Sequence, residues 1–191
     1  MKKLLLGLAV IAGSFTFAQK TSSSPVTFGL KAGLNVSNIS GGNSKAGFYG
    51  GAFMNAPIAS NFSIQPEVLY NGLGSKIKDE NITVNFNYIS VPVMFQYNAL
   101  PNLYLEAGPQ FSFSVGSNLK YDSQTIDKGN LVKAKSFDFG IGLGAGYYFN
   151  KNIGVTARYV AGVTDAFKEI GGVKNIDGKN SAFQVGLAYK F

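Results

Sequence analysis

The last stretch of the chain, residues 181–191, alternates without a break between a large apolar side chain and a small or polar one. Successive side chains of a β-strand point to opposite faces of the sheet, so this alternation predicts a strand with one apolar face. The same pattern recurs in residues 26–37, 46–56, 62–71, 88–97, 103–115, 137–149 and 153–163. We therefore expect eight strands, each about as long as the roughly 9 to 11 residues that a tilted strand needs to cross a bilayer.

Polar side chains are confined to one face of these predicted strands. No charged side chain and no amide falls on the apolar face of any segment, whereas the opposite face holds charges, amides and many glycines. Two architectures share such a pattern: a water-soluble barrel with its apolar face inside, and a membrane barrel with its apolar face outside. The alternation alone leaves both open.

Three observations favour the membrane barrel. Glycines crowd the polar face, as expected where a narrow lumen leaves little room for side chains. The charges of that face balance, which suits an enclosed space where an unpaired charge is costly. Apolar-face aromatic residues gather near the shorter connections, as in an interfacial girdle. The balancing charges are Lys31, Arg158 and Lys190 against Glu67, Glu106 and Asp138.

The connections give the barrel an orientation. Short connections near residues 57–61, 98–102 and 150–152 alternate with longer ones at 38–45, 72–87, 116–136 and 164–180. Short turns of such barrels face the periplasm and long loops face outward. We predict an all-β, eight-stranded antiparallel up-and-down transmembrane β-barrel. It has three short periplasmic turns and four long outer loops, and both termini are periplasmic.

The amino-terminal residues predict export. Lys2 and Lys3 precede the apolar run 4–13, and small residues up to Ala18 suit cleavage. This is typical of a secretory signal peptide, whereas a membrane-spanning helix would need a longer apolar run and a stop-transfer flank. We expect a cleaved signal peptide over residues 1–18, a flexible lead-in over 19–25 and a barrel domain over 26–191.

The segments 62–70 (FSIQPEVLY) and 88–92 (YISVP), together with the alternating strand that ends in Phe191, resemble the porin-like family of eight-stranded bacterial outer-membrane barrels, of PorT-like or OmpA/OmpX-like type. The resemblance implies a place in the bacterial outer membrane among lipids that include lipopolysaccharide. It also implies a carboxy-terminal signal for the barrel assembly machinery, and periplasmic chaperones during biogenesis. The side chains assigned to that signal are Phe183, Val185, Leu187, Tyr189 and Phe191.

Composition narrows the chemistry. The chain has no Cys and no His, so thiolate and imidazole sites are excluded. A net charge of +7 is not gathered in a basic run or stripe, and we expect no nucleic-acid partner. The glycines of residues 140–144 lie inside a strand and open no helix, so they predict no dinucleotide site. We expect no enzyme activity, no cofactor and no metal, and a monomer.

The inward charges form the candidate site. Lys31, Glu67, Glu106 and Arg158 all face the lumen near the short turns, and we expect an ion-pair network. Glu67 and Glu106 also fit a glycosidase acid and base, but a lumen filled by side chains offers no cleft for a sugar.

This architecture predicts a structural or surface-interaction role, with recognition in the exposed loops. Lysines outnumber acidic residues in the long loops, which favours an anionic surface such as lipopolysaccharide, and residues 116–136 and 164–180 are the expected contact segments. The alternatives are a narrow porin-like channel for small solutes and a soluble lipid-binding barrel.

Overall fold

The structure is a computed structural model that describes residues 25–39, 44–76, 82–121, 124–126, 132–134, 136–165, 167–170, 173–174 and 179–191. The predicted signal peptide and most of the predicted lead-in lie outside these ranges. No helix within the described ranges is long and apolar enough to cross a membrane.

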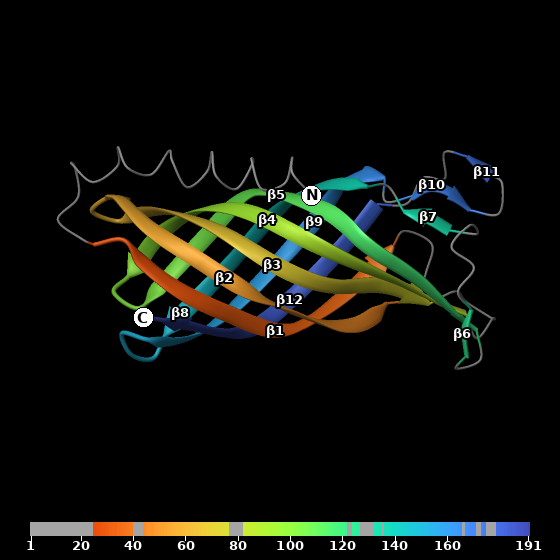
Figure 1. The fold of residues 1–191 in the computed structure, drawn as a ribbon. Coiled ribbons are helices and arrows are strands. Elements are labelled where there is room, and N and C mark those ends of the chain that lie inside the picture. Colours follow the sequence, from red (N-terminus) through yellow and green to blue (C-terminus); the bar gives the residue numbers. More distant parts are fainter. Residues whose placement is uncertain are drawn as a thin grey trace.

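Eight antiparallel strands close into a barrel (Figure 1). Each pairs with its neighbours along the chain, and the last strand pairs with the first, so the sheet of the barrel wall has no free edge. The predicted all-β, eight-stranded up-and-down fold is confirmed. The wall consists of β1 (Thr27–Ile39), β2 (Lys45–Ala59), β3 (Phe62–Lys76), β4 (Ile82–Leu100), β5 (Leu103–Tyr121), β8 (Phe137–Tyr148), β9 (Ile153–Asp165) and β12 (Lys179–Lys190).

The two faces of the wall follow the alternation of the sequence. Large apolar side chains such as Leu34 and Leu187 are exposed on the outside, whereas inward polar side chains such as Asn35 and Gln184 are buried in the lumen. A soluble barrel would show the reverse arrangement. The soluble lipid-binding alternative is therefore wrong, because the apolar residues that would have to line its cavity cover its outer surface.

The two ends of the barrel differ. Residues 60–61, 101–102 and 149–152 join β2 to β3, β4 to β5 and β8 to β9, and we call this the short-turn end. The opposite end is the long-loop end, and the carboxy terminus lies at the short-turn end (Figure 1). Asn150 shapes one short turn, because its side-chain oxygen accepts hydrogen bonds from the backbone N–H groups of Asn152 at 2.9 Å and Ile153 at 2.7 Å.

The long-loop end holds more strand than the sequence pattern predicted. Residues 72–76 pair with residues 83–87, although 72–87 was expected to be a loop. A short strand, β6 (Gln124–Ile126), pairs with the end of β5. Three others, β7 (Val132–Ala134), β10 (Phe167–Ile170) and β11 (Val173–Lys174), form a separate sheet at this end (Figure 1). The loops expected at 116–136 and 164–180 thus contain strand pairing of their own.

Aromatic side chains form contacts on the outer surface near the short-turn end, where a girdle was expected. Their ring centroids lie 5.1 Å apart for Phe62 and Tyr97, and 5.5 Å apart for Tyr189 and Phe191. A second group of aromatic side chains, which the sequence pattern did not predict as a girdle, lies nearer the long-loop end. Its ring-centroid contacts are Phe111–Phe139 at 5.4 Å and Phe113–Phe137 at 5.6 Å.

Candidate functional site in the barrel lumen

The four charged residues proposed for the lumen come from four strands: Lys31 from β1, Glu67 from β3, Glu106 from β5 and Arg158 from β9. All four side chains face inward and are buried, with Glu67 only 1% and Arg158 only 3% exposed. Charged groups withdrawn from water to this degree are costly unless they are paired and hydrogen-bonded. Their contacts meet that requirement.

Strand register brings Arg158 and Glu106 together across a glycine. Gly144 of β8 pairs with Glu106 on one side and with Arg158 on the other. A Cβ atom on Gly144 would lie 3.0 Å from the Glu106 carboxylate, tighter than ordinary packing. With no side chain between them, Arg158 Nε donates a hydrogen bond of 2.7 Å to Glu106 Oε1.

The same guanidinium also crosses the lumen to Glu67. Arg158 Nη1 and Nη2 donate to the two Glu67 oxygens at 2.8 and 2.7 Å, the two-pronged geometry in which arginine pairs best with a carboxylate. Lys31 Nζ donates to Glu67 Oε1 at 2.8 Å. Since β3 and β9 are not neighbours in the wall, the contact between Arg158 and Glu67 links opposite parts of the barrel.

Three amides extend these ion pairs into a closed circuit. Gln65 donates to Glu67 at 2.8 Å, and Gln96 donates to Glu106 at 3.0 Å. The Asn55 side-chain NH₂ donates to Gln65 at 3.2 Å and to Gln96 at 2.8 Å. We name this circuit the luminal ring. Its members are Asn55, Gln65, Glu67, Arg158, Glu106 and Gln96, with Lys31 attached.

The alternation of the sequence places the three amides on the inward face but does not assign them to the network. A signal was present for two of them. Gln65 lies two residues before Glu67 and so shares its face, and Gln96 lies directly opposite Glu106 in the β4–β5 register. Asn55 lies opposite Gln65 in the β2–β3 ladder, but its second contact, with Gln96 of β4, passes over the intervening strand, and neither alternation nor local spacing indicates that contact.

An aromatic layer fills the lumen between the ring and the short-turn end. Phe53, Tyr104 and Tyr148 are buried there, and the Tyr104 and Tyr148 ring centroids lie 6.0 Å apart. Lys190 Nζ sits 3.9 Å from the centre of the Tyr148 ring, a cation–π contact. Gly146 makes room for this layer, because a Cβ atom at that position would collide with the Tyr104 ring.

The chemistry of the ring is that of paired charges. Glu67 and Glu106 both accept hydrogen bonds from Arg158, so neither carboxylate stands open to a substrate. Within the described ranges, no cluster of three or more His, Cys, Asp or Glu residues is placed to hold a metal ion. Both carboxylates are therefore held in ion pairs with Arg158 inside the lumen.

The proposed assembly signal lies on the outer face of β12. Phe183, Val185, Leu187 and Tyr189 are exposed there, and Phe191 is the most exposed of the set at 71%. The Phe191 backbone N–H donates to the Phe28 carbonyl oxygen at 2.9 Å, so the last residue also ties the end of the chain to the first strand of the barrel. Recognition by an assembly machinery stays a prediction.

Comparison with solved structures supports the fold. The Ail attachment invasion locus protein of Yersinia pestis is 15% identical, with a TM-score of 0.53, and the match covers 88% of this chain and all of that one. Neisserial surface protein A is 13% identical, with a TM-score of 0.59, and covers the same shares. No curated protein sequence matches the chain.

Family membership comes from the sequence itself. The family described as outer membrane protein beta-barrel domain matches residues 17–168, which is most of the chain. The closed antiparallel barrel with its apolar outer surface agrees with that description. The chain belongs to the outer membrane protein β-barrel domain family.

Proposed function

We propose that the protein is a closed outer-membrane barrel that anchors its long-loop end at the cell surface for interaction with other molecules. The short-turn end, with the carboxy terminus, faces the periplasm, as in other barrels of this kind. The luminal ring is the observation that carries this proposal. It joins side chains of β1, β2, β3, β4, β5 and β9 across the lumen.

The ring supports a closed lumen on energetic grounds. A solute crossing at this level would have to separate Arg158 from Glu67 or Glu106, and all three side chains are buried. Breaking a buried pair typically costs about 3 to 5 kcal/mol, because the remaining charge is left desolvated. The aromatic layer toward the short-turn end adds a second obstruction.

Ion conductance in planar lipid bilayers tests the closed lumen. We expect the refolded wild-type protein to show no sustained conductance. Arg158→Ala should produce brief openings, because it removes the link across the lumen. Lys151→Ala, which deletes a cation from a short turn, is the control and should behave as wild type. Steady conductance of the wild-type protein would refute a closed barrel.

A narrow channel for small solutes is the second candidate. The observation in its favour is that the ring is polar and hydrogen-bonded, so rearranged side chains would leave a path that water can wet. Sustained conductance by the wild-type protein, with an ion selectivity that changes in Arg158→Gln, would establish this role in place of the first.

The long-loop end is the proposed contact surface, with anionic groups such as those of lipopolysaccharide as the partner. Lys133 on β7, Lys168 on β10 and Lys174 on β11 lie in the small sheet there. Lysine side chains attract anions through a long-range, salt-sensitive field. Ail, a barrel of similar fold, has been solved with the heparin analogue sucrose octasulfate.

Shortening the connections tests this surface. Replacing residues 116–135 and 166–178 by tight turns should leave the folded barrel intact and abolish salt-sensitive binding to lipopolysaccharide vesicles, because Ser114 lies beside Ser136 and Asp165 pairs with Lys179. Vesicles of zwitterionic lipid are the control for insertion. Binding that persists in the shortened protein would place the contact elsewhere on the barrel.

A further inference from the structure

Three prolines lie in adjacent strands of the barrel wall: Pro66 in β3, Pro92 in β4 and Pro109 in β5. Proline has no backbone N–H, so in sheets it is largely confined to edge strands and bulges. The closed wall has no edge, and the register does not shift at any of the three positions. Pro66 lies between the outward-facing Phe62 and Tyr70, inside the apolar part of the wall. We call these three residues the wall prolines.

Pro92 removes a hydrogen bond between β3 and β4. The Asn98 N–H donates to the Asn61 carbonyl oxygen at 2.8 Å, so residue 98 of β4 faces β3. Alternate residues of a strand face the same neighbour, and Pro92 therefore also faces β3, opposite Glu67. The Glu67 carbonyl oxygen thus lacks the N–H that this position of the ladder would supply.

The other two wall prolines act on the neighbouring ladders. By the same alternation, Pro66 faces β2 opposite Met54, and Pro109 faces β4 opposite Val93. Pairing of β2 with β3, of β3 with β4 and of β4 with β5 is interrupted for two residues of each strand beside a proline. The ladders β1–β2, β5–β8 and β8–β9 run without interruption over their paired residues. One side of the wall is therefore held locally by fewer backbone hydrogen bonds than the other.

The luminal ring is built across these interruptions. Asn55 donates to Gln65 at 3.2 Å, and both residues lie in the interrupted part of the β2–β3 ladder. Glu67, which lies opposite Pro92, accepts hydrogen bonds of 2.8 and 2.7 Å from the Arg158 guanidinium. Side-chain bonds thus hold the strands at the level where backbone bonds are missing.

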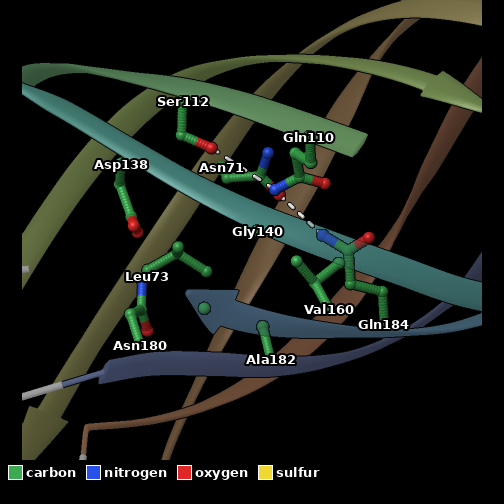
Figure 2. Close-up of a pocket in the computed structure, with 11 residues that line it drawn as sticks. Asn71, Leu73, Gln110, Ser112, Asp138, Gly140, Val160, Asn180, Ala182 and Gln184 are labelled. Carbon is green, nitrogen blue, oxygen red and sulfur yellow. Dashed lines mark hydrogen bonds between the residues drawn. The ribbon is translucent and has the colours of Figure 1, made fainter. Parts of the chain in front are cut away.

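Packing of the lumen is loose on the long-loop side of the ring. A cavity of about 20 Å³ is lined there by Asn71 of β3 and Gln110 of β5, together with side chains of β8, β9 and β12 (Figure 2). Asn71 Nδ2 and Gln110 Oε1 have no hydrogen-bond partner among the described residues, although Gln184 donates to Asn71 Oδ1 at 2.8 Å. A void leaves the atoms around it without contacts on one side. The inner faces of β3 and β5 are therefore free to shift slightly at this level.

We propose that β3 and β4 form a movable section of the barrel wall, which opens beside the wall prolines and is held shut by the luminal ring. Separating these strands at this level breaks fewer backbone hydrogen bonds than separating β8 from β9. Local opening of a folded protein occurs where its free-energy cost is lowest. Glu67 holds the section shut, because its side chain ties β3 to Arg158 on the opposite part of the wall.

Amide hydrogen exchange of the refolded full-length protein in detergent micelles, followed by NMR, tests this proposal. The Leu69 and Ser90 amides border the interruption between β3 and β4, whereas Leu143 and Tyr159 pair within the uninterrupted β8–β9 ladder. We expect the protection factors of Leu69 and Ser90 to be at least about tenfold lower. Equal protection of the two pairs would overturn the proposal.

Pro92→Val supplies the missing N–H and should raise the protection of Leu69 and Ser90 to that of the β8–β9 pair. Pro101→Val adds an N–H in a short turn, outside the paired positions of the ladder, and is the control that should change neither pair. If Pro92→Val leaves the protection unchanged, the missing donor is not the cause of opening and the proposal fails. Pro92→Ala restores the same N–H and replaces this variant if Pro92→Val does not fold.

Glu67→Gln tests the part that the luminal ring plays, because it keeps the size of the side chain and removes the charge that Arg158 binds. The protection of Leu69 and Ser90 should fall further, while that of Leu143 and Tyr159 should stay as in the wild type. No change at Leu69 and Ser90, or an equal fall in both ladders, would show that the ring does not hold this section shut and would refute the proposal.

Discussion

Arg158 is the residue on which the arrangement of the lumen depends, because its guanidinium donates to carboxylates of two different strands. Alternation along the sequence is enough to place Arg158, Glu67, Glu106 and Lys31 on the inward face. It does not predict which of them touch, since that depends on how far each strand is shifted against the next. Gly144 decides one of these contacts, because it lies between Arg158 and Glu106 in the register.

Removing the Glu67 side chain tests whether its contact with Arg158 stabilises the fold. Glu67→Ala should lower the free energy of unfolding by about 3 to 5 kcal/mol, because Arg158 and Lys31 lose a shared acceptor, with a smaller loss if water enters the lumen. In a chain that already carries Arg158→Ala, the same change should cost clearly less. Urea unfolding in lipid vesicles measures both values.

The control for this cycle is Glu169→Ala, which deletes a carboxylate from β10 outside the barrel wall and should leave stability nearly unchanged. Strictly additive losses for the two substitutions would show that Glu67 and Arg158 are not energetically coupled, whatever the distance between them.

At the scale of the element, the strands could be predicted where one face meets an apolar surface and the other meets the lumen. The prediction fails at the long-loop end, and β4 shows why. Its apolar residues Ile82, Val84 and Phe86 have the opposite parity to Ile89 and Val91, so the apolar face does not continue through the strand. A part of a strand that extends beyond the apolar layer of the membrane does not contact lipid, so its outer face need not be apolar. Backbone pairing with β3 continues all the same.

The last strand carries the prediction that belongs to this scale. Phe191→Asp should reduce the amount of protein in the outer membrane, because it puts a charge at the lipid boundary and removes the terminal aromatic ring. The backbone bond from residue 191 to Phe28 does not need the ring, so the variant should still fold in detergent. Immunoblots of membrane fractions measure the first effect, and electrophoretic mobility of refolded protein measures the second.

Phe149→Asp is the matched control, since Phe149 is an exposed aromatic residue near the same end of the barrel but not at the chain terminus. If both variants reach the membrane in equal amounts, position 191 carries no special signal. Wild-type levels of Phe191→Asp would remove the case for an assembly signal there.

At the scale of the whole molecule, a closed hydrogen-bonded wall should resist sodium dodecyl sulfate at room temperature and yield on boiling. Unheated protein from outer-membrane fractions should therefore migrate faster than boiled protein. Intact mass should correspond to a chain that begins at Gln19, if the predicted cleavage after Ala18 occurs. Identical mobility before and after boiling would contradict a stable barrel, and a mass that includes residue 1 would contradict cleavage.

The seam between β1 and β12 sets the conditions for folding. Its register runs from Gly29 opposite Lys190 to Ile39 opposite Asn180, so it joins segments that are far apart in the chain, whereas the other pairings of the wall join strands that follow one another. Until the seam forms, both strands present unpaired edges to which another chain can add. An open sheet would keep both edges exposed, so we expect the seam to close in one cooperative transition with the rest of the wall, with no stable open sheet. This single ladder thus decides whether a nascent barrel becomes one closed molecule or enters an aggregate.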